Sequence, residues 1–420
     1  MIRDAHISLL DIVMCLSSSM DLISKQVVNH HKRVAAISLG VATEMGMSLE
    51  YQNNLTIAAL LHDCGAFSCY ERIQLLEFDN ESAEIEKHAE IGYSLLNSFK
   101  PFEKVAPIVR FHHRDFGTGP EALERVPIAS YILHLADRVD SLVDLERDIL
   151  GQVKDICDKL DENVGTKFLP EAVNVFKKLA LRESFWFDVL YSPIDQIVNR
   201  RSGLIKIELN MDELLGLAEL FCRFIDFRSK FTSTHSTGVA ATAETIGRLV
   251  GFSERECNMI KIAGYLHDLG KLAIPLEILE KADKLTQSEF NIVKRHSFYT
   301  YILLEPIKDL EIIATWGSFH HERLDGKGYP FHHDKKNLSV GARIIAVADV
   351  FTALTEDRPY RKGMSVDEAI AILSTMAGEG AIDAGIVSVL TQNLDEINAF
   401  RVLYQTKASK LYSDYLIFDD

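Results

Sequence analysis

The chain has 420 residues, which is too long for one ordinary hydrophobic core and suits two domains. Its 61 Asp and Glu outnumber its 45 Lys and Arg, and the net charge of −16 excludes a general nucleic-acid or anionic-membrane binder. Ten prolines are few for this length and favour long helices, whereas fifteen histidines are the unusual count.

The cysteines and the N-terminus indicate the compartment. The six cysteines form no C-x-x-C pair, which is typical of reduced core residues and predicts a cytoplasmic protein. Asp4 and Asp11 interrupt the first apolar stretch, so we expect no signal peptide. No apolar run reaches about 18 residues, so we expect neither a membrane span nor a membrane partner.

Helical periodicity dominates both halves, and strand-like alternation is lacking, which predicts an all-α fold. The clearest helical stretches, in chain order, are Leu55–Leu61, Pro170–Leu181, Glu254–Leu272 and Asp367–Met376. Pro, Gly and Arg interrupt the pattern near residues 192–207, where we place the domain boundary. The predicted domains are residues 1–200 and 208–420.

The chain also repeats itself, first at an offset of 205 residues and then, after small insertions, at 208 and 212. Ten of the fifteen histidines belong to this repeat. The first-half series is His30, His62, Asp63, His88, His112, His113 and Asp137, and the second-half series is His235, His267, Asp268, His296, His320, His321 and Asp349. The histidines outside it, for which we expect surface or packing roles, are His6, His31, His134, His332 and His333.

Five imidazoles and two carboxylates without cysteine form a nitrogen and oxygen donor set, which suits Fe, Mn, Zn or Ni. Seven donors exceed what one ion needs and fit two ions bridged by a carboxylate. A single buried histidine is more often a packed core residue than a ligand. The repetition of the whole series in both halves favours metal binding over packing.

At these positions the chain resembles the HD superfamily of metal-dependent phosphohydrolases, and its second half resembles the HD-GYP phosphodiesterases. The matching strings are H-D-L-G-K at 267–271, H-H-E-R-L-D-G-K-G-Y-P at 320–330 and A-D-V-F-T-A-L-T-E-D-R-P-Y-R at 348–361. The resemblance implies two tandem all-helical HD-type domains, the second of which hydrolyses cyclic dinucleotides in bacterial second-messenger signalling. Cyclic di-GMP and 3′3′-cGAMP are both compatible substrates, and a linear 5′-phosphorylated dinucleotide is the implied product.

The resemblance also implies roles for individual residues. The second-half series would hold two divalent ions, iron or manganese first and nickel, zinc or magnesium as alternatives, with Asp268 bridging and acting in catalysis. Lys271 would lie beside the scissile phosphate and stabilise developing charge. Arg358 and Arg361, three residues apart, could share a helix face and bind the substrate phosphates. Tyr329 would contact the substrate or, alternatively, only shape its loop.

Two departures from the family pattern bear on the second half. Some HD-GYP members bind a third metal ion through a glutamate one helical turn before the first histidine, but this chain has Phe231 there. We therefore expect a binuclear centre. The family usually has Asp where this chain has Thr352, so we expect a change in the groups that support the ligands.

The first half keeps the donor series but has Ala66 in place of the lysine and lacks the G-Y-P and R-P-Y-R strings. It therefore resembles a plain HD domain with a second metal site that does not cleave the cyclic substrate. Two alternatives stay open: nucleotidase activity in the first half, and a non-catalytic dinucleotide receptor or scaffold. A diguanylate-cyclase-type protein partner and a homodimer are compatible with the resemblance, and no DNA or RNA partner is expected.

Overall fold

The computed structural model describes residues 7–22, 28–66, 83–117, 126–200, 207–229, 232–357 and 362–416. The chain divides into two compact units. One, the first-half unit, comprises Met20–Ile207, and the other, the second-half unit, comprises Met1–Ser19 with Glu208–Asp420. Residues 7–19, which we expected in the first domain, thus group by their contacts with the second half.

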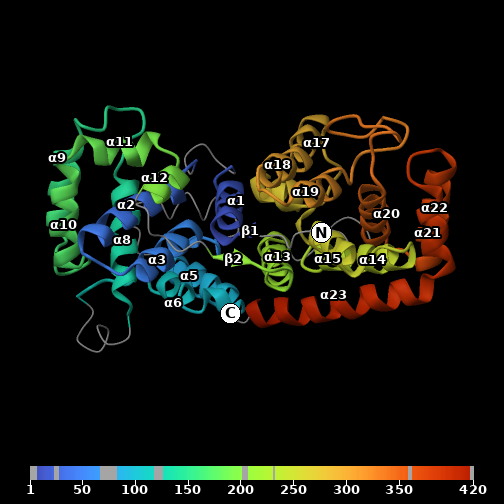
Figure 1. Cartoon of the computed structure of the whole chain (residues 1–420), viewed down its shortest axis with the longest axis horizontal. Coiled ribbons are helices and arrows are strands. Elements are labelled where there is room, and N and C mark those ends of the chain that lie inside the picture. The colour runs from blue at the N-terminus through green and yellow to red at the C-terminus, as the bar shows by residue number, and fades with distance from the viewer. Residues whose placement is uncertain are drawn as a thin grey trace. The chain divides into compact units, whose positions relative to one another are not determined.

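The first-half unit consists of helices in the part of it that the structure describes (Figure 1). These are α2 (His30–Glu44), α3 (Leu49–Leu61), α5 (Ala83–Asn97), η1 (Lys100–Phe102), α6 (Ala106–Arg110), α8 (Ile128–Ser141), α9 (Val153–Asp161), α10 (Pro170–Ala180), α11 (Glu183–Tyr191) and α12 (Ile194–Arg200). Helix α2 is buried over most of its length and packs against α3 and α8. Helices α10, α11 and α12 also contact it, so α2 carries few of the polar residues that a surface helix shows.

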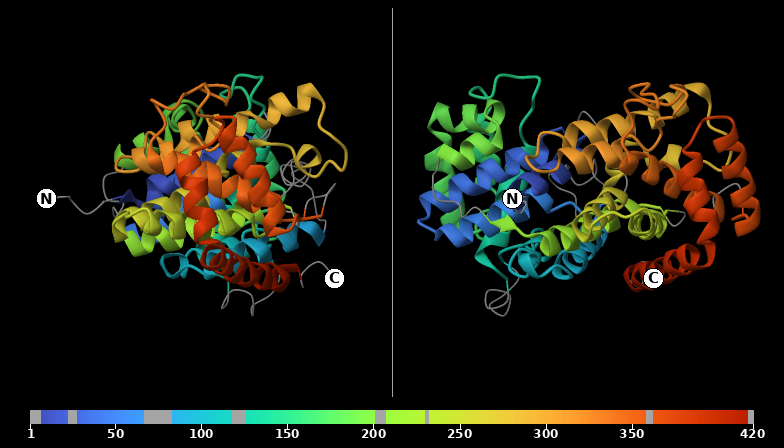
Figure 2. Two further views of the ribbon diagram at one scale, coloured as in Figure 1. Left: turned by 90° about the vertical axis from the view of Figure 1, so that its right-hand side faces the viewer. Right: turned by 45° about the vertical axis from the view of Figure 1, so that its right-hand side comes forward.

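The second-half unit contains a short two-stranded sheet and a larger set of helices. They are β1 (Ile7–Ser8), α1 (Leu9–Asp21), β2 (Glu208–Leu209), α13 (Met211–Asp226), α14 (His235–Leu249), α15 (Glu254–Leu266), η2 (Leu269–Ala273), α16 (Leu276–Leu279), α17 (Gln287–Val293), α18 (Arg295–Leu304), α19 (Glu311–Ser318), α20 (Val340–Thr355), α21 (Val366–Gly378), α22 (Ala384–Gln392) and α23 (Leu394–Leu416). The last two residues of α1, Met20 and Asp21, belong to the first-half unit. Helix α14 is the counterpart of α2 and packs against α15, α20 and α23. Figure 2 shows the long helix α23 from two further directions.

Local sequence signals set several helix starts. Four helices of the second-half unit begin with a capping box, in which the first polar side chain and a Glu three residues later satisfy each other's backbone amides: Asn210/Glu213, Ser253/Glu256, Thr286/Glu289 and Ser365/Glu368. The box at Ser253 fixes the start of α15, and the His267-Asp268 pair follows its end directly. The sequence thereby positions these two side chains.

A glycine shared by both halves lets the turn after each His-Asp pair approach the next histidine helix. A Cβ atom at Gly270 would lie 2.0 Å from the carbonyl oxygen of His296, and one at Gly65 would lie 2.1 Å from that of His88. No real Cβ atom fits at such distances. These glycines therefore bring the two ligand-bearing segments into direct contact in each unit.

The prediction of an all-α fold is confirmed, with the β1–β2 pair, in which Ile7 opposes Leu209, as a small addition. The helix expected over Glu254–Leu272 is shorter than predicted, because α15 ends at Leu266 and a 3-10 turn follows. Across the described ranges no helix has the length and apolar character needed to cross a membrane. No disulfide joins the described cysteines.

Candidate metal centres

The seven predicted donor side chains of the second half converge from five helices. His235 begins α14, His267 and Asp268 follow α15, His296 lies in the first turn of α18, His320 and His321 follow α19, and Asp349 lies in α20. All of them are buried except His321, which is half-buried. The structure thus brings the whole series together in one place.

Asp268 lies between two groups of imidazole nitrogens. Its Oδ1 is 3.4 Å from His296 Nε2 and 3.9 Å from His320 Nε2. Its Oδ2 is 3.2 Å from His267 Nε2 and 3.9 Å from His235 Nε2. Two sets of donor atoms, each within 4.8 Å of one another, result: His296, His320, His321; and His235, His267, Asp268. One carboxylate oxygen faces each set, which is the arrangement a bridging ligand requires.

Backbone carbonyl groups orient three of the imidazoles. The Nδ1 atoms of His267, His296 and His320 each donate to the carbonyl oxygen three residues earlier, at 2.6–2.7 Å. Each Nε2 therefore carries a lone pair directed into the site. Within the described structure, His267 Nε2 and Asp268 Oδ1 are buried without a hydrogen-bond partner. Such unsatisfied buried atoms fit a bound metal ion.

The electrostatics favour metal binding as well. Burial lowers the pKa of His296 to about 3 and that of His321 to about 4, so both imidazoles are neutral near pH 7. Burial by itself raises the pKa of Asp268, but the neighbouring His267 imidazole and Lys271 ammonium hold that pKa well below its usual range. Neutral imidazoles and an ionised carboxylate are the forms that bind divalent metals.

Lys271 lies at this centre. Its Nζ is 2.5 Å from Asp268 Oδ2, and its side chain is 20% exposed, so it can reach a bound molecule. The guanidinium of Arg228 donates to the carbonyl oxygens of Lys271 at 2.6 Å and Ile274 at 3.1 Å. Arg228, which belongs to none of the sequence motifs, thus fixes the 3-10 turn η2 that carries Lys271.

The remaining predicted substrate contacts have different outcomes. The Tyr329 ring lies 4.8 Å from that of His321, centroid to centroid, and Lys294 Nζ lies 5.5 Å from the tyrosine centroid. Tyr329 therefore lies at the edge of the donor cluster and packs on one of its members. Arg358, Arg361 and Phe231 lie outside the described residues.

Glu356 orients the first histidine of the second half, and sequence reasoning missed it. His235 Nε2 lies 3.1 Å from Asp349 Oδ1, and His235 Nδ1 lies 2.8 Å from Glu356 Oε2. Glu356 lies four residues after Thr352, the position where the family usually has Asp. The Glu356 carboxylate therefore provides the hydrogen bond to His235 that Thr352 does not. Gln405 of α23 donates to the other carboxylate oxygen of Glu356.

The first-half unit repeats the arrangement around Asp63. Asp63 Oδ1 is 3.5 Å from His88 Nε2, and Oδ2 is 3.4 Å from His62 Nε2. Asp137 Oδ1 lies 3.4 Å from His30 Nε2. Again two sets of donor atoms lie within 4.8 Å of one another: Asp63, His88, His112, His113; and His30, His62, Asp63. Both HD-type units therefore contain clusters able to hold metal ions.

The two units support their first histidine differently. In the first half, Asp140 accepts from His30 Nδ1 at 2.8 Å and is held by Arg33 at 2.6 and 2.9 Å. The repeat places Thr352 at the position of Asp140, and Gly238 at that of Arg33. A Cβ atom at Gly238 would lie 2.6 Å from the Nε2 of Gln405, so the missing side chain makes room for the amide behind Glu356.

Among the histidines outside the repeat, His31 departs from expectation. Its side chain is buried, and its Nε2 lies 3.8 Å from Asp63 Oδ2. The others that the structure describes match the expected roles: His134 is buried and contacts Phe168, His332 is exposed, and His333 stacks with Phe331. The adjacent His30 belongs to the predicted series. The sequence indicates a place for His31 near the metal centre only through the pair of histidines, His30 and His31, at the start of a helix.

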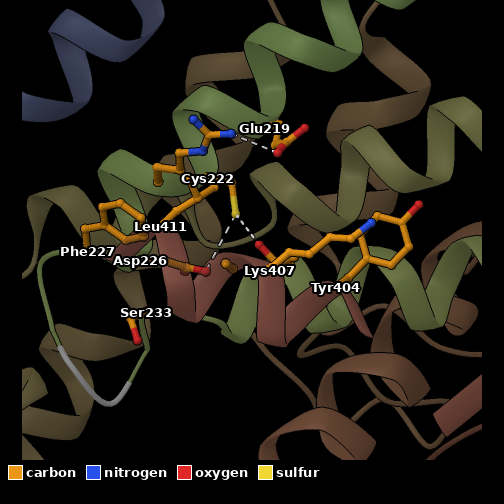
Figure 3. Close-up of a pocket in the computed structure, with 11 residues that line it drawn as sticks. Glu219, Cys222, Asp226, Phe227, Ser233, Tyr404, Lys407 and Leu411 are labelled. Atoms are coloured by element: carbon orange, nitrogen blue, oxygen red, sulfur yellow. Dashed lines mark hydrogen bonds and ion pairs between the residues drawn. The ribbon is translucent and has the colours of Figure 1, made fainter. Parts of the chain in front are cut away.

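A separate pocket of about 230 Å³ lies between α13 and α23 in the second-half unit (Figure 3). Cys222 Sγ lies 3.6 Å from Asp226 Oδ2 and 3.5 Å from Thr237 Oγ1 at its wall. Asp226 also accepts from the Ser236 hydroxyl at 2.6 Å and from the Ser236 amide at 2.9 Å. Asp226 therefore anchors the first turn of α14, next to His235.

Residues 27–162 and residues 219–386 each match a family model described as an HD domain, and together the matches span more than half of the 420 residues. The chain therefore belongs to the HD-domain proteins and carries two HD domains, which confirms the tandem organisation inferred from the repeat.

Among known proteins, the chain is 29% identical over 402 residues to 3′3′-cGAMP-specific phosphodiesterase 1 of Vibrio cholerae, an alignment that covers 92% of each chain. It is 39% identical over 158 residues to the cyclic di-GMP phosphodiesterase response regulator RpfG of Xanthomonas campestris, covering 37% of this chain and 42% of that relative. The crystal structure of the V. cholerae cyclic GMP-AMP-specific phosphodiesterase V-cGAP3 superposes with a TM-score of 0.66 at 24% identity, over 93% of this chain and 98% of that one. This likeness shows the shared fold.

Proposed function

We propose that the chain is a metal-dependent phosphodiesterase that hydrolyses cyclic dinucleotides in its second-half unit. The observation that carries the proposal is the set of seven donor residues, six of them buried, that is centred on Asp268, with Lys271 Nζ 2.5 Å from one oxygen of that aspartate. Phosphodiester hydrolysis needs charge neutralisation on both sides of the phosphorus, which this arrangement is suited to provide.

In this proposal two divalent ions, iron or manganese, occupy the second-half centre. One would be held by His235, His267, Asp268 and Asp349, and the other by Asp268, His296, His320 and His321. When bound, such a pair lowers the pKa of a water molecule and neutralises charge on the phosphate. We propose a binuclear rather than trinuclear centre because Phe231 offers no ligand atom at the position where some HD-GYP members have a glutamate.

The chain's own residues complete the site. The ammonium of Lys271 pairs with Asp268 and, at 20% exposure, can donate to a phosphoryl oxygen as charge develops there. Arg228 holds the lysine backbone from behind, so the turn loses little freedom on binding. Tyr329, Arg358 and Arg361 are proposed to contact the substrate.

For the substrate we favour 3′3′-cGAMP, because the relative aligned over 92% of both chains is specific for it. Cyclic di-GMP is the alternative, since shorter regions of the chain resemble phosphodiesterases for that molecule. In either case opening one phosphodiester gives a linear 5′-phosphorylated dinucleotide. The first-half unit, in which Ala66 replaces the lysine, is proposed to bind metal without cleaving this substrate.

A substrate panel tests the proposal. Purified full-length protein loaded with Mn²⁺, or with Fe²⁺ under anaerobic conditions, is incubated with 3′3′-cGAMP, cyclic di-GMP and a linear mononucleotide ester, and the products are separated by chromatography. We expect linear dinucleotide from 3′3′-cGAMP and none from H267A. Binding of the cyclic dinucleotide without turnover would identify a receptor, and turnover of the mononucleotide ester alone would identify a nucleotidase.

A further inference from the structure

The two HD units differ at the residue that follows the first histidine of the donor series. The repeat aligns His31 with Ser236 and, ten residues earlier in each half, Asp21 with Asp226. In both units this aspartate accepts a hydrogen bond from the side chain in question, His31 in one and Ser236 in the other. The supporting carboxylate is the same, but the side chain that it holds is not.

The difference in side-chain length changes what reaches the metal centre. The Ser236 hydroxyl donates to Asp226 at 2.6 Å and has no further polar atom to offer. The His31 imidazole uses Nδ1 for Asp21 and has a second nitrogen on the far side of its ring. That Nε2 lies 3.8 Å from Asp63 Oδ2, the same oxygen that faces His62 at 3.4 Å.

The environment of His31 Nε2 is that of a metal ligand. The side chain is 1% exposed, and within the described residues Nε2 makes no hydrogen bond. Leaving a buried polar atom without a partner destabilises the folded state. The His31 ring lies 5.3 Å from that of His30 and 5.1 Å from that of His62, centroid to centroid. A carboxylate on Nδ1 and an open Nε2 are typical of histidines that bind metals.

We propose that His31 is a further metal ligand of the first-half centre, binding a transition-metal ion through Nε2 on the side of Asp63 Oδ2. The inference rests on the proposed metal binding by this unit and adds a ligand that the second half lacks. His31 lies outside the two tight donor sets and adds an imidazole beside the set of His30, His62 and Asp63.

An extra protein ligand takes a coordination position that would otherwise be open to water or substrate. Closed sites retain metal and serve structure, whereas catalytic sites keep a position open. In addition, Arg138 pairs with the other oxygen of Asp137 at 2.6 Å, so protein already engages that oxygen. With His31 as a ligand, the first-half centre would have one coordination position fewer open to water or substrate than the second-half centre.

The test uses the full chain with the second-half centre disabled by H267A and D268A, so that bound metal reports on the first half. Titration calorimetry with Mn²⁺ and metal analysis after dialysis compare this background with added H31N or H62A. The asparagine amide can occupy the place of the Nδ1–H group and keep the bond to Asp21, but it offers nothing at the Nε2 position. We expect H31N to weaken Mn²⁺ binding at least about tenfold.

The outcomes distinguish the ligand role of His31 from the existence of the first-half metal site. Unchanged Mn²⁺ affinity in H31N, together with its loss in H62A, would overturn the role of His31 while the first-half metal site stands. No Mn²⁺ binding in the background, or equal binding with H62A, would remove the site itself. The metal-free melting temperature of H31N should match that of the background. If the melting temperature falls, H31S provides the second comparison, because the second half has a serine, Ser236, at the equivalent position. Unchanged Mn²⁺ affinity in H31S would also overturn the proposal.

Discussion

The contact between Glu356 and His235 gives a prediction that joins the last part of the chain to the metal centre. Their side chains are 9% and 2% exposed and meet at 2.8 Å, so E356A removes a buried, charge-assisted hydrogen bond from a proposed ligand. Bonds of this type contribute about 1.5–3 kcal/mol. Loss of a supporting partner lowers metal affinity or activity about 10–100-fold. We therefore expect E356A to weaken Mn²⁺ binding at the second-half centre by about 10–100-fold.

Titration calorimetry and the metal dependence of kcat measure this effect. E356Q keeps an acceptor oxygen but loses the charge, so it should fall between wild type and E356A. Q405A removes the amide behind Glu356 and leaves the bond to His235, and it should change affinity less.

Rescue provides the sharper comparison. Asp140 supports His30 in the first half, and Thr352 occupies the equivalent position in the second. T352D added to E356A should therefore restore part of the Mn²⁺ affinity. If E356A binds Mn²⁺ as wild type does, the assignment of Glu356 as the supporting group is wrong.

Further predictions concern which unit cleaves the substrate and the roles of Lys271 and Gly270 in the turn after His267 and Asp268. H62A should leave cleavage of the cyclic dinucleotide largely intact, whereas H267A or D268A should abolish it; equal losses in a product assay would contradict separate roles for the two units. K271A should lower kcat by about 100-fold or more with the metal content unchanged, and an unchanged kcat would remove the lysine from the mechanism. G270A should destabilise the second-half unit by about 1–3 kcal/mol or more, because the added Cβ atom would lie 2.0 Å from a backbone oxygen of α18. Chemical denaturation measures this, and a wild-type midpoint would argue against the close approach.

The sequence by itself predicted the donor residues and determined the tandem organisation. Metal ligation depends on residue type, and the repeated series, together with the long strings around His320 and Asp349, left few other interpretations for its side chains. Helical periodicity was sufficient for the fold class, since the apolar faces of α15 and α21 recur with the helical period. The exact end of α15 was not predictable, because the break at Asp268 depends on packing of Gly270 against another helix.

Only the tertiary structure decided which side chains support and extend these centres. Glu356 lies 121 residues from His235 along the chain, and no local pattern links them until helix packing brings α14 and α20 together. His31 follows His30, and neighbours on a helix point about 100° apart, so spacing argues that only one faces the centre. The carboxylate of Asp21, from α1, holds the second imidazole so that its Nε2 also reaches the Asp63 side of the cluster. The direction of a side chain, unlike its type, is set by such contacts between different helices.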